Sequence, residues 1–180
     1  MPIRRASAYS KKRITVYTRK SQKVKHLNYI KAVPNQKVTK FNMGAVSRFN
    51  KGEFKNFLTI ISEMNLQIRD MALEAARQYL NNQLTRKLID NYYLACKPYP
   101  HHVIRENKTF SGGSKGERVQ SGMAHSFGTT MGRSAYVKVG GPIFIIGFQN
   151  KKDIDDIRKL CKSAAAKLPG KTKIIFEEVK

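Results

Sequence analysis

The sequence predicts an α+β fold with an antiparallel or mixed β-sheet, two helices packed on one face, a basic N-terminal extension and a long glycine-rich loop. Three observations predict it. Two segments with helical spacing alternate with β-rich segments, which is typical of helices covering a sheet. The first 52 residues carry 14 Lys and Arg and no carboxylate, and residues 111–133 hold six glycines and almost no aliphatic side chain.

The first half of the body predicts one strand and one helix. Residues 54–62 (FKNFLTIIS) are rich in β-formers and predict a strand. Asn65 is expected to cap a helix that runs to about Leu84. Its core-facing stripe is Leu66, Leu73, Ala76, Leu80 and Leu84, and the residues expected to stay solvated are Asp70, Glu74, Arg77, Gln78 and Asn81.

The second half predicts an extended segment, two strands, a helix and a final strand. Residues 92–105 are extended, and Pro98 and Pro100 place them at a sheet edge or across a bulge. Residues 134–148 predict two strands with a turn at residues 140–142. Asn150 is expected to cap a helix whose buried face is Ile154, Ile157, Leu160, Cys161 and Ala164. That helix stops at residues 168–170, and residues 171–179 form the last strand.

The sequence thus predicts a basic extension, residues 1–52, and an α+β core, residues 53–180, which carries the glycine-rich loop, residues 109–133. A chain of 180 residues with 41% apolar content can bury a core, hiding roughly 70% of its unfolded surface.

Net charge is the most informative global property. The chain has 35 Lys and Arg against 12 Asp and Glu, a formal charge of +23, which favours a polyanionic partner and nucleic acid first of all. A membrane is disfavoured because no segment approaches ~20 consecutive apolar residues. Since the N-terminus also lacks the apolar run of a signal peptide, the sequence predicts a soluble, cytoplasmic protein.

The N-terminal segment combines cations with apolar residues. Tyr9, Ile14, Tyr17 and Tyr29 are interleaved with Lys and Arg, which suits a segment that lies along a phosphate backbone while packing its apolar groups elsewhere. The alternative is a merely solvated basic tail, which does not need those apolar residues. The cations expected to contact RNA here are Arg4, Arg5, Arg13, Arg19, Lys20 and Lys23.

The glycine-rich loop favours an anion-facing surface. Glycine backbones can approach another backbone closely and turn their N–H groups towards phosphate oxygens. The cations that flank the glycines, and that can bind phosphate, are Arg105, Lys108, Lys115, Arg118 and Arg133. Such a loop suits insertion into folded RNA; the alternative is a flexible surface loop.

Enzyme motifs are weak. Gly116 is followed by Glu117 where a phosphate-binding P-loop needs Lys, and the glycines do not join a strand to a helix as a dinucleotide fingerprint requires. An RNA-modifying or phosphate-ester enzyme using His101, His102 or His125 remains the alternative function, although no Ser, Cys or carboxylate stands near them in a recognisable nucleophile or base-orienting pattern. Cys96 and Cys161 predict reduced packing residues, so no metal or cofactor is expected.

Several short motifs resemble one ribosomal protein family. They are residues 102–108 (HVIRENK), 118–123 (RVQSGM), 126–128 (SFG), 149–151 (QNK) and 168–171 (LPGK). In combination they resemble the large-subunit ribosomal protein called L ten-e in archaea and eukaryotes, whose bacterial counterpart is L sixteen. The likeness covers roughly residues 25 to 176. The segment before Phe54 fits the archaeal and eukaryotic branch, and the lack of a long C-terminal extension favours the archaeal one.

The resemblance implies a constituent of the large ribosomal subunit that binds ribosomal RNA beside neighbouring ribosomal proteins. It also implies that the loop is directed towards transfer RNA in the peptidyl and aminoacyl sites, near the peptidyl transferase centre. Ala124 and Thr129 depart from the family pattern, which puts individual phosphate contacts in doubt. The residues carried over as RNA contacts are Arg105, Asn107, Lys108, Arg118, Gln120, Gly122, Met123, Phe127 and Gly128.

Overall fold

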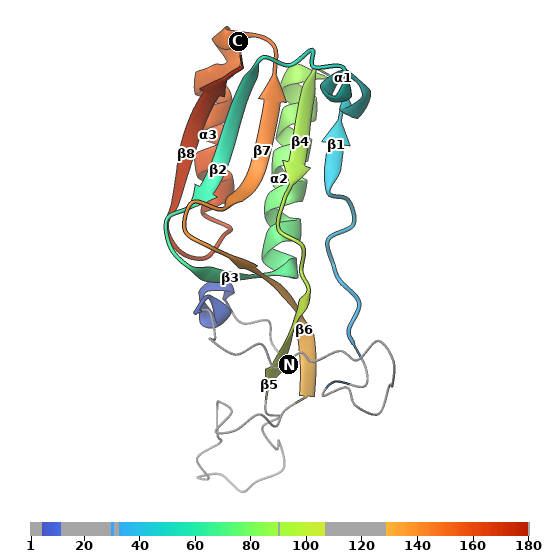
Figure 1. Cartoon of the computed structure of the whole chain (residues 1–180), viewed down its shortest axis with the longest axis vertical. Helices are drawn as coiled ribbons and strands as arrows, with labels where there is room; N and C mark the ends of the chain where they lie inside the picture. The colour runs from blue at the N-terminus through green and yellow to red at the C-terminus, as the bar shows by residue number, and fades with distance from the viewer. Residues whose placement is uncertain (1–4, 12–29, 31–32, 90, 107–128, 180) are drawn as a thin grey trace, which may run out of the picture.

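Two antiparallel sheets form the body of the protein (Figure 1). The computed structural model describes residues 5–11, 30, 33–89, 91–106 and 129–179. The larger sheet has the order β1-β4-β7-β2-β8 and the smaller one the order β3-β6-β5. The strands are β1 (Asn42–Gly44), β2 (Asn56–Ser62), β3 (Leu66–Arg69), β4 (Tyr92–Cys96), β5 (His102–Glu106), β6 (Thr129–Val137), β7 (Pro142–Phe148) and β8 (Thr172–Glu178).

Two long helices, α2 (Asp70–Leu88) and α3 (Ile154–Ala165), cover the same face of the five-stranded sheet, as Figure 1 shows. The shorter elements are α1 (Val46–Asn50) and the 3-10 turns η1 (Ala6–Tyr9) and η3 (Lys151–Asp153). Leu80 of α2, Cys161 of α3 and Ile146 of β7 are fully buried in one core between helices and sheet. The predicted α+β class, with two helices on one face, is confirmed.

The predicted start of the first helix is wrong. Residues 66–69 form β3, which pairs with β6 in the register Leu66↔Val137 to Arg69↔Ser134. The helix begins at Asp70, whose Oδ1 accepts the backbone amide of Met71 at 2.8 Å, and continues to Leu88. Asn65 caps nothing, and its Oδ1 accepts the amide of Val139 at 3.3 Å. Leu66 fits the seven-residue spacing to Leu73 of a helical stripe, but it also alternates with Ile68 as in a strand, and a partner strand far along the chain decided between the two.

Two residues expected to be solvated on this helix are buried. Asp70 is 3% exposed and Arg77 is 8% exposed. Gln78 is exposed, while Glu74 and Asn81 are half-buried. The first two turns of the polar face of α2 are therefore covered by another part of the chain.

The chain passes between the two sheets four times: from β2 to β3, from β3 through α2 to β4, from β4 to β5, and from β6 to β7. The predicted extended segment over residues 92–105 is split into β4 in the larger sheet and β5 in the smaller one, with Pro98 and Pro100 in the crossing. The two strands predicted over residues 134–148 are β6 and β7, joined through the turn at Gly140, but they also belong to different sheets. The first of them starts earlier than predicted, at Thr129.

The second helix and its flanks largely follow the prediction. The helix α3 begins at Ile154 after η3, and Asn150 makes no capping side-chain hydrogen bond, so the predicted cap is wrong. Asp155 and Asp156 lie in the first turn, where the helix dipole favours carboxylates. Cys96 and Cys161 are buried free thiols, which confirms their packing role, and burial raises the pKa of each to about 12.

The sheet face opposite the long helices carries a smaller apolar cluster. Phe54, Tyr93 and Ala95 are buried in it, and Phe49 of α1 stacks on Tyr93 with ring centroids 3.9 Å apart. The helix α1 thus covers one end of this face.

Candidate nucleic-acid interface

The strands that flank the glycine-rich segment form a hairpin stem. β5 and β6 pair antiparallel, and their last matched residues are Glu106 and Thr129. Residues 107–128 lie outside the described residues, and this pair joins the described residues on either side of them. The three-stranded sheet therefore holds both ends of the predicted loop, at the end of the molecule farthest from α1 (Figure 1).

The N-terminal segment reaches the same small sheet at two places. Ser10 O accepts the amide of Gln67 at 2.8 Å, and Lys11 forms a bridge to Leu66, so residues 10–11 extend the sheet at β3. Arg133 of β6 donates from Nε to the carbonyl oxygen of Pro34 at 2.6 Å. Described residues on both sides of the basic segment 12–32 thus contact the sheet that carries the loop.

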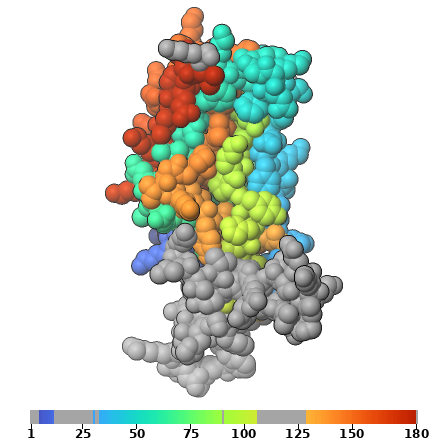
Figure 2. Space-filling view, in the orientation of Figure 1, coloured from blue at the N-terminus to red at the C-terminus, as the bar shows by residue number. Residues whose placement is uncertain are grey.

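Residues 33–44, which we call the strap, run along the body from the small sheet and end with β1 at the edge of the larger sheet. In the space-filling view the strap lies beside the residues of β4 (Figure 2). Val38 is 2% exposed and Met43 is 7% exposed, and both belong to the main core. The predicted extension comprises residues 1–52, and its strap is accordingly packed on the body. RNA binding by the extension stays a prediction.

Polar residues of α2 hold the strap. Asp70 Oδ2 accepts the amide of Lys37 at 3.2 Å, and Glu74 Oε2 accepts the amide of Thr39 at 3.4 Å. Arg77 donates to both carboxylate oxygens of Glu74, at 2.7 and 2.6 Å, and its Nη1 lies 2.8 Å from the sulfur of Met43. Because Lys37 and Lys40 of the strap are exposed, this anchoring leaves its cations on the surface.

Replacing Glu74 with glutamine is expected to destabilise the protein by roughly 2 kcal/mol, because Arg77 loses its charged partner while it stays buried. The hydrogen bonds from Arg77 hold the pKa of Glu74 below its usual value. The wild type should therefore lose this stabilisation as pH falls below about 4.5, through the lowered pKa of Glu74 in the folded state, and the variant should not. Urea unfolding at pH 7 and across the acid range measures both effects.

The matched control is Glu53→Gln, which removes the carboxylate from an ion pair with Arg48 whose side chains are 32% and 37% exposed. It should cost less than about 1 kcal/mol. Equal losses in the two variants would contradict a special role of Glu74 in holding the strap.

Three predicted RNA-binding residues lie within the described part of the chain. Arg5 is exposed just before η1, Arg105 is half-buried on β5, and Arg133 is half-buried and bonded to Pro34. The structure brings Arg105 and Arg133 onto neighbouring strands of one sheet. The other predicted contacts lie outside the described residues: Arg4, Arg13, Arg19, Lys20, Lys23, Asn107, Lys108, Lys115, Arg118, Gln120, Gly122, Met123, Phe127 and Gly128.

One face of the small sheet carries a buried polar layer. His102 lies opposite Ser134, and Gln67 lies opposite Tyr136, so these side chains share a face. The ring of His102 stacks on Tyr136 with centroids 4.9 Å apart, and His102 is 4% exposed. Among the described residues, Gln67 Oε1 and Ser134 Oγ are buried without a hydrogen-bond partner.

In the part of the chain that the structure describes, His101 and His102 do not form a catalytic site. His102 is stacked and buried, while His101 is exposed with its Nδ1 3.1 Å from the carbonyl oxygen of Tyr99. His125 lies outside the described residues. The sequence did not indicate that the guanidinium of Arg69 lies over the ring of Tyr9, 5.1 Å from its centroid. It also did not indicate that the acids on α2 hold the strap. Only the spacing of Asp70, Glu74 and Arg77 along one helix could have signalled the latter.

A net charge of +23, with cations clustered in two segments whose described flanks meet at one small sheet, is typical of the class of basic proteins that bind polyanions. Comparison of the sequence with known protein families identifies the class more closely. Residues 15–175 match the model of the family described as ribosomal protein L16p/L10e. The chain belongs to this family, and the resemblance found in its motifs is confirmed.

Full-length relatives agree with this assignment. The chain is 36% identical to a protein of Thermofilum pendens named large ribosomal subunit protein uL16, over 99% of both chains. It is 37% identical to the protein of that name in Sulfolobus acidocaldarius, over 97% of this chain and 93% of the relative. A third, from Pyrobaculum calidifontis, is 36% identical over 98% and 95% of the two chains.

These archaeal relatives support the predicted archaeal branch. Members of the family are structural proteins of the cytoplasmic large ribosomal subunit and not enzymes, so the histidine-based alternative function is not supported. Within the described residues, no helix is long and apolar enough to cross a membrane.

Proposed function

We propose that the protein is a structural constituent of the large ribosomal subunit that binds ribosomal RNA through two segments held on one sheet. The basic N-terminal segment and the glycine-rich loop supply the cations, and the three-stranded sheet sets their relative position. Both segments end in described residues on that sheet, Lys11 and Pro34 for the first and Glu106 and Thr129 for the second. This convergence is the observation that carries the proposal.

The chemistry of the two segments supports RNA as the ligand. The net charge of +23 favours a polyanion, and arginine binds phosphate through two parallel hydrogen bonds. Loops whose glycines expose backbone N–H groups suit folded RNA, which proteins recognise mainly by shape and phosphate position. The proposed RNA contacts are the seventeen residues predicted from the sequence. Of these, Arg133 also holds the N-terminal segment, because its Nε donates to the carbonyl oxygen of Pro34.

The loop is further proposed to face transfer RNA near the peptidyl transferase centre, beside neighbouring ribosomal proteins. The support is the family membership together with the pairing of Glu106 with Thr129, the described residues on either side of the glycine-rich segment. Residues 1–52 and 53–180 are correspondingly proposed as the RNA-binding extension and the core.

The double variant Arg105→Ala/Arg118→Ala tests this function. Loss of two phosphate contacts should weaken binding to large-subunit ribosomal RNA by ~2 kcal/mol, a roughly thirtyfold loss. The same variant should incorporate poorly into large subunits or place transfer RNA poorly. Filter binding at fixed salt and sucrose-gradient analysis of subunits measure these effects.

The control removes the same charge elsewhere. Lys152 of η3 and Lys159 of α3 are exposed cations on elements that lie away from the small sheet. Lys152→Ala/Lys159→Ala should bind RNA nearly as the wild type does. Wild-type binding and translation in the Arg105/Arg118 variant, or equal losses in both variants, would contradict the proposed interface.

A further inference from the structure

The strand β8 is an open edge of the larger sheet. It pairs with β2 in an unbroken register from Asn56↔Glu178 to Ser62↔Thr172, and the strand order ends there (Figure 1). Among the described strands none pairs with its other side. It has seven residues and no proline or bulge, so it presents a regular row of backbone groups to a further strand.

The apolar side chains of β8 are incompletely covered. Ile174, Ile175 and Phe176 are each half-buried, whereas Leu58, the partner of Phe176 on β2, is fully buried. Successive residues of a strand point to opposite faces, so apolar surface is left bare on both faces of this edge. A partner that covers it must itself carry apolar groups.

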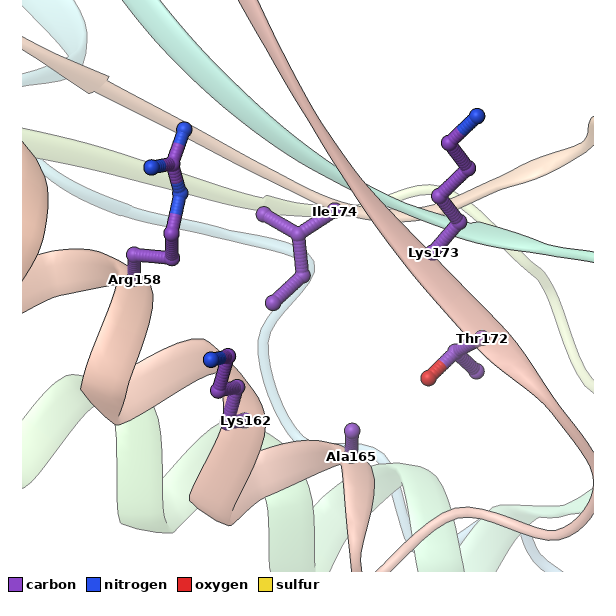
Figure 3. A pocket seen from close by; sticks show the side chains of 6 residues that line it. All are labelled: Arg158, Lys162, Ala165, Thr172, Lys173 and Ile174. Atoms are coloured by element: carbon purple, nitrogen blue, oxygen red, sulfur yellow. The ribbon is translucent and has the colours of Figure 1, made fainter.

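A groove lies between β8 and α3. It encloses about 400 Å³ and is lined by Arg158, Lys162, Ala165, Thr172, Lys173 and Ile174. Figure 3 shows that Arg158 and Lys162 rise from α3, while Thr172 and Ile174 reach towards them from the strand and Lys173 points to its other side. The floor of the groove is thus apolar and its helical wall is cationic.

No carboxylate lines this groove. The nearest described partner of Arg158 is Asp155, whose side chain is 85% exposed, at an Nη1–Oδ1 distance of 3.9 Å. An exposed pair at that distance stabilises little, so Arg158 keeps its capacity to bind an anion. Lys162 stands one helical turn further on and faces the same space.

We propose that β8 accepts an extended peptide with alternating acidic and apolar side chains as an added strand. Its acidic side chains would meet Arg158 and Lys162 in the groove, and its apolar side chains would cover Ile175 on the open face. Strand addition supplies backbone hydrogen bonds and leaves specificity to alternate side chains. A phosphate backbone has no apolar side chain to cover Ile175, and a second copy of the chain is disfavoured because two molecules of charge +23 repel each other.

This site is independent of the proposed RNA interface. β8 is at the opposite edge of the larger sheet from β1, to which the strap leads. The test of the β8 site therefore uses the full chain without RNA. A negative result in the RNA-binding experiment would not contradict peptide binding at β8.

The probe is a fluorescein-labelled octapeptide of alternating Glu and Val, followed by fluorescence anisotropy. The groove variant Arg158→Glu/Lys162→Glu is compared with Lys152→Glu/Lys159→Glu, which makes the same charge change outside the groove lining. We expect about tenfold weaker binding or more in the groove variant relative to the control variant. A peptide N-methylated at each residue should bind at least about tenfold more weakly, since it cannot donate to the strand.

Hydrogen exchange locates the peptide. Bound peptide should slow exchange of amides in β8 and leave those of β1 unchanged. Equal losses in the two charge variants, undiminished binding of the N-methylated peptide, or protection outside β8 would each overturn the proposal. Displacement of the peptide by duplex RNA with protection of the same groove, or dimerisation through β8 in sedimentation, would overturn it as well.

Discussion

Replacing Gly44 with alanine is expected to destabilise the protein by about 3 kcal/mol, because backbone strain and a steric overlap with backbone add together. Gly44 has φ +79°, a conformation that costs an L-residue about 1–2 kcal/mol. Its added Cβ would also overlap the backbone carbonyl oxygen of Tyr92. That oxygen accepts the amide of Ala45 at 2.8 Å, so relieving the overlap would weaken the pairing of β1 with β4.

Guanidinium unfolding of the two proteins measures this loss, and the melting temperature should fall by about 10 °C in a chain of this size. The matched control is Gly52→Ala. Gly52 has φ +73° but nothing within 4 Å of an added Cβ, so only the conformational cost of about 1 kcal/mol applies. If both variants lose the same stability, the close approach of β1 to β4 has no energetic importance.

The affinity of the protein for ribosomal RNA is expected to fall about 10³- to 10⁵-fold between 50 and 200 mM salt. The reason is counterion release: neutralising ~6 to 10 phosphates returns that many condensed cations to solution. The 14 cations of residues 1–52, with those flanking the glycine-rich segment, are sufficient for such a number. Filter binding with a large-subunit ribosomal RNA fragment over a salt series gives the slope.

The slope also distinguishes the residues that contact phosphate. Arg105→Ala/Arg118→Ala should reduce it by about 2, one for each lost phosphate contact, whereas Lys152→Ala/Lys159→Ala should leave it unchanged. A nearly flat salt dependence of the wild type would contradict binding through phosphate contacts.

Local patterns predicted most of the elements because they depend on near neighbours. The spacing of Leu73, Ala76, Leu80 and Leu84 places one face of α2 in the core, and all four are buried. The strand β2 and the turn at Gly140 follow from β-rich composition and glycine in the same local way. Residues 66–69 were predicted wrongly because their partners on β6 lie about seventy positions further along the chain.

The candidate site was less predictable than the fold. Arginine and glycine composition pointed to the two cation-rich segments, yet nothing in the sequence indicated that both end on one small sheet. Arg133 shows the limit well: it was predicted as a phosphate contact, and its Nε binds the carbonyl of Pro34, 99 positions away. Asp70 and Arg77 were expected in solvent for the same reason, since the strap that covers them is remote in sequence.

By itself the sequence determined the charge of the protein, the helical and strand segments, and, through its motifs, the ribosomal family to which the chain belongs. The division into two sheets, the anchoring of the strap on α2 and the open edge at β8 were decided only by the tertiary structure. The physical reason is that periodicity records which face of a segment avoids water, whereas pairing and burial between remote segments depend on the free energy of the whole packed chain.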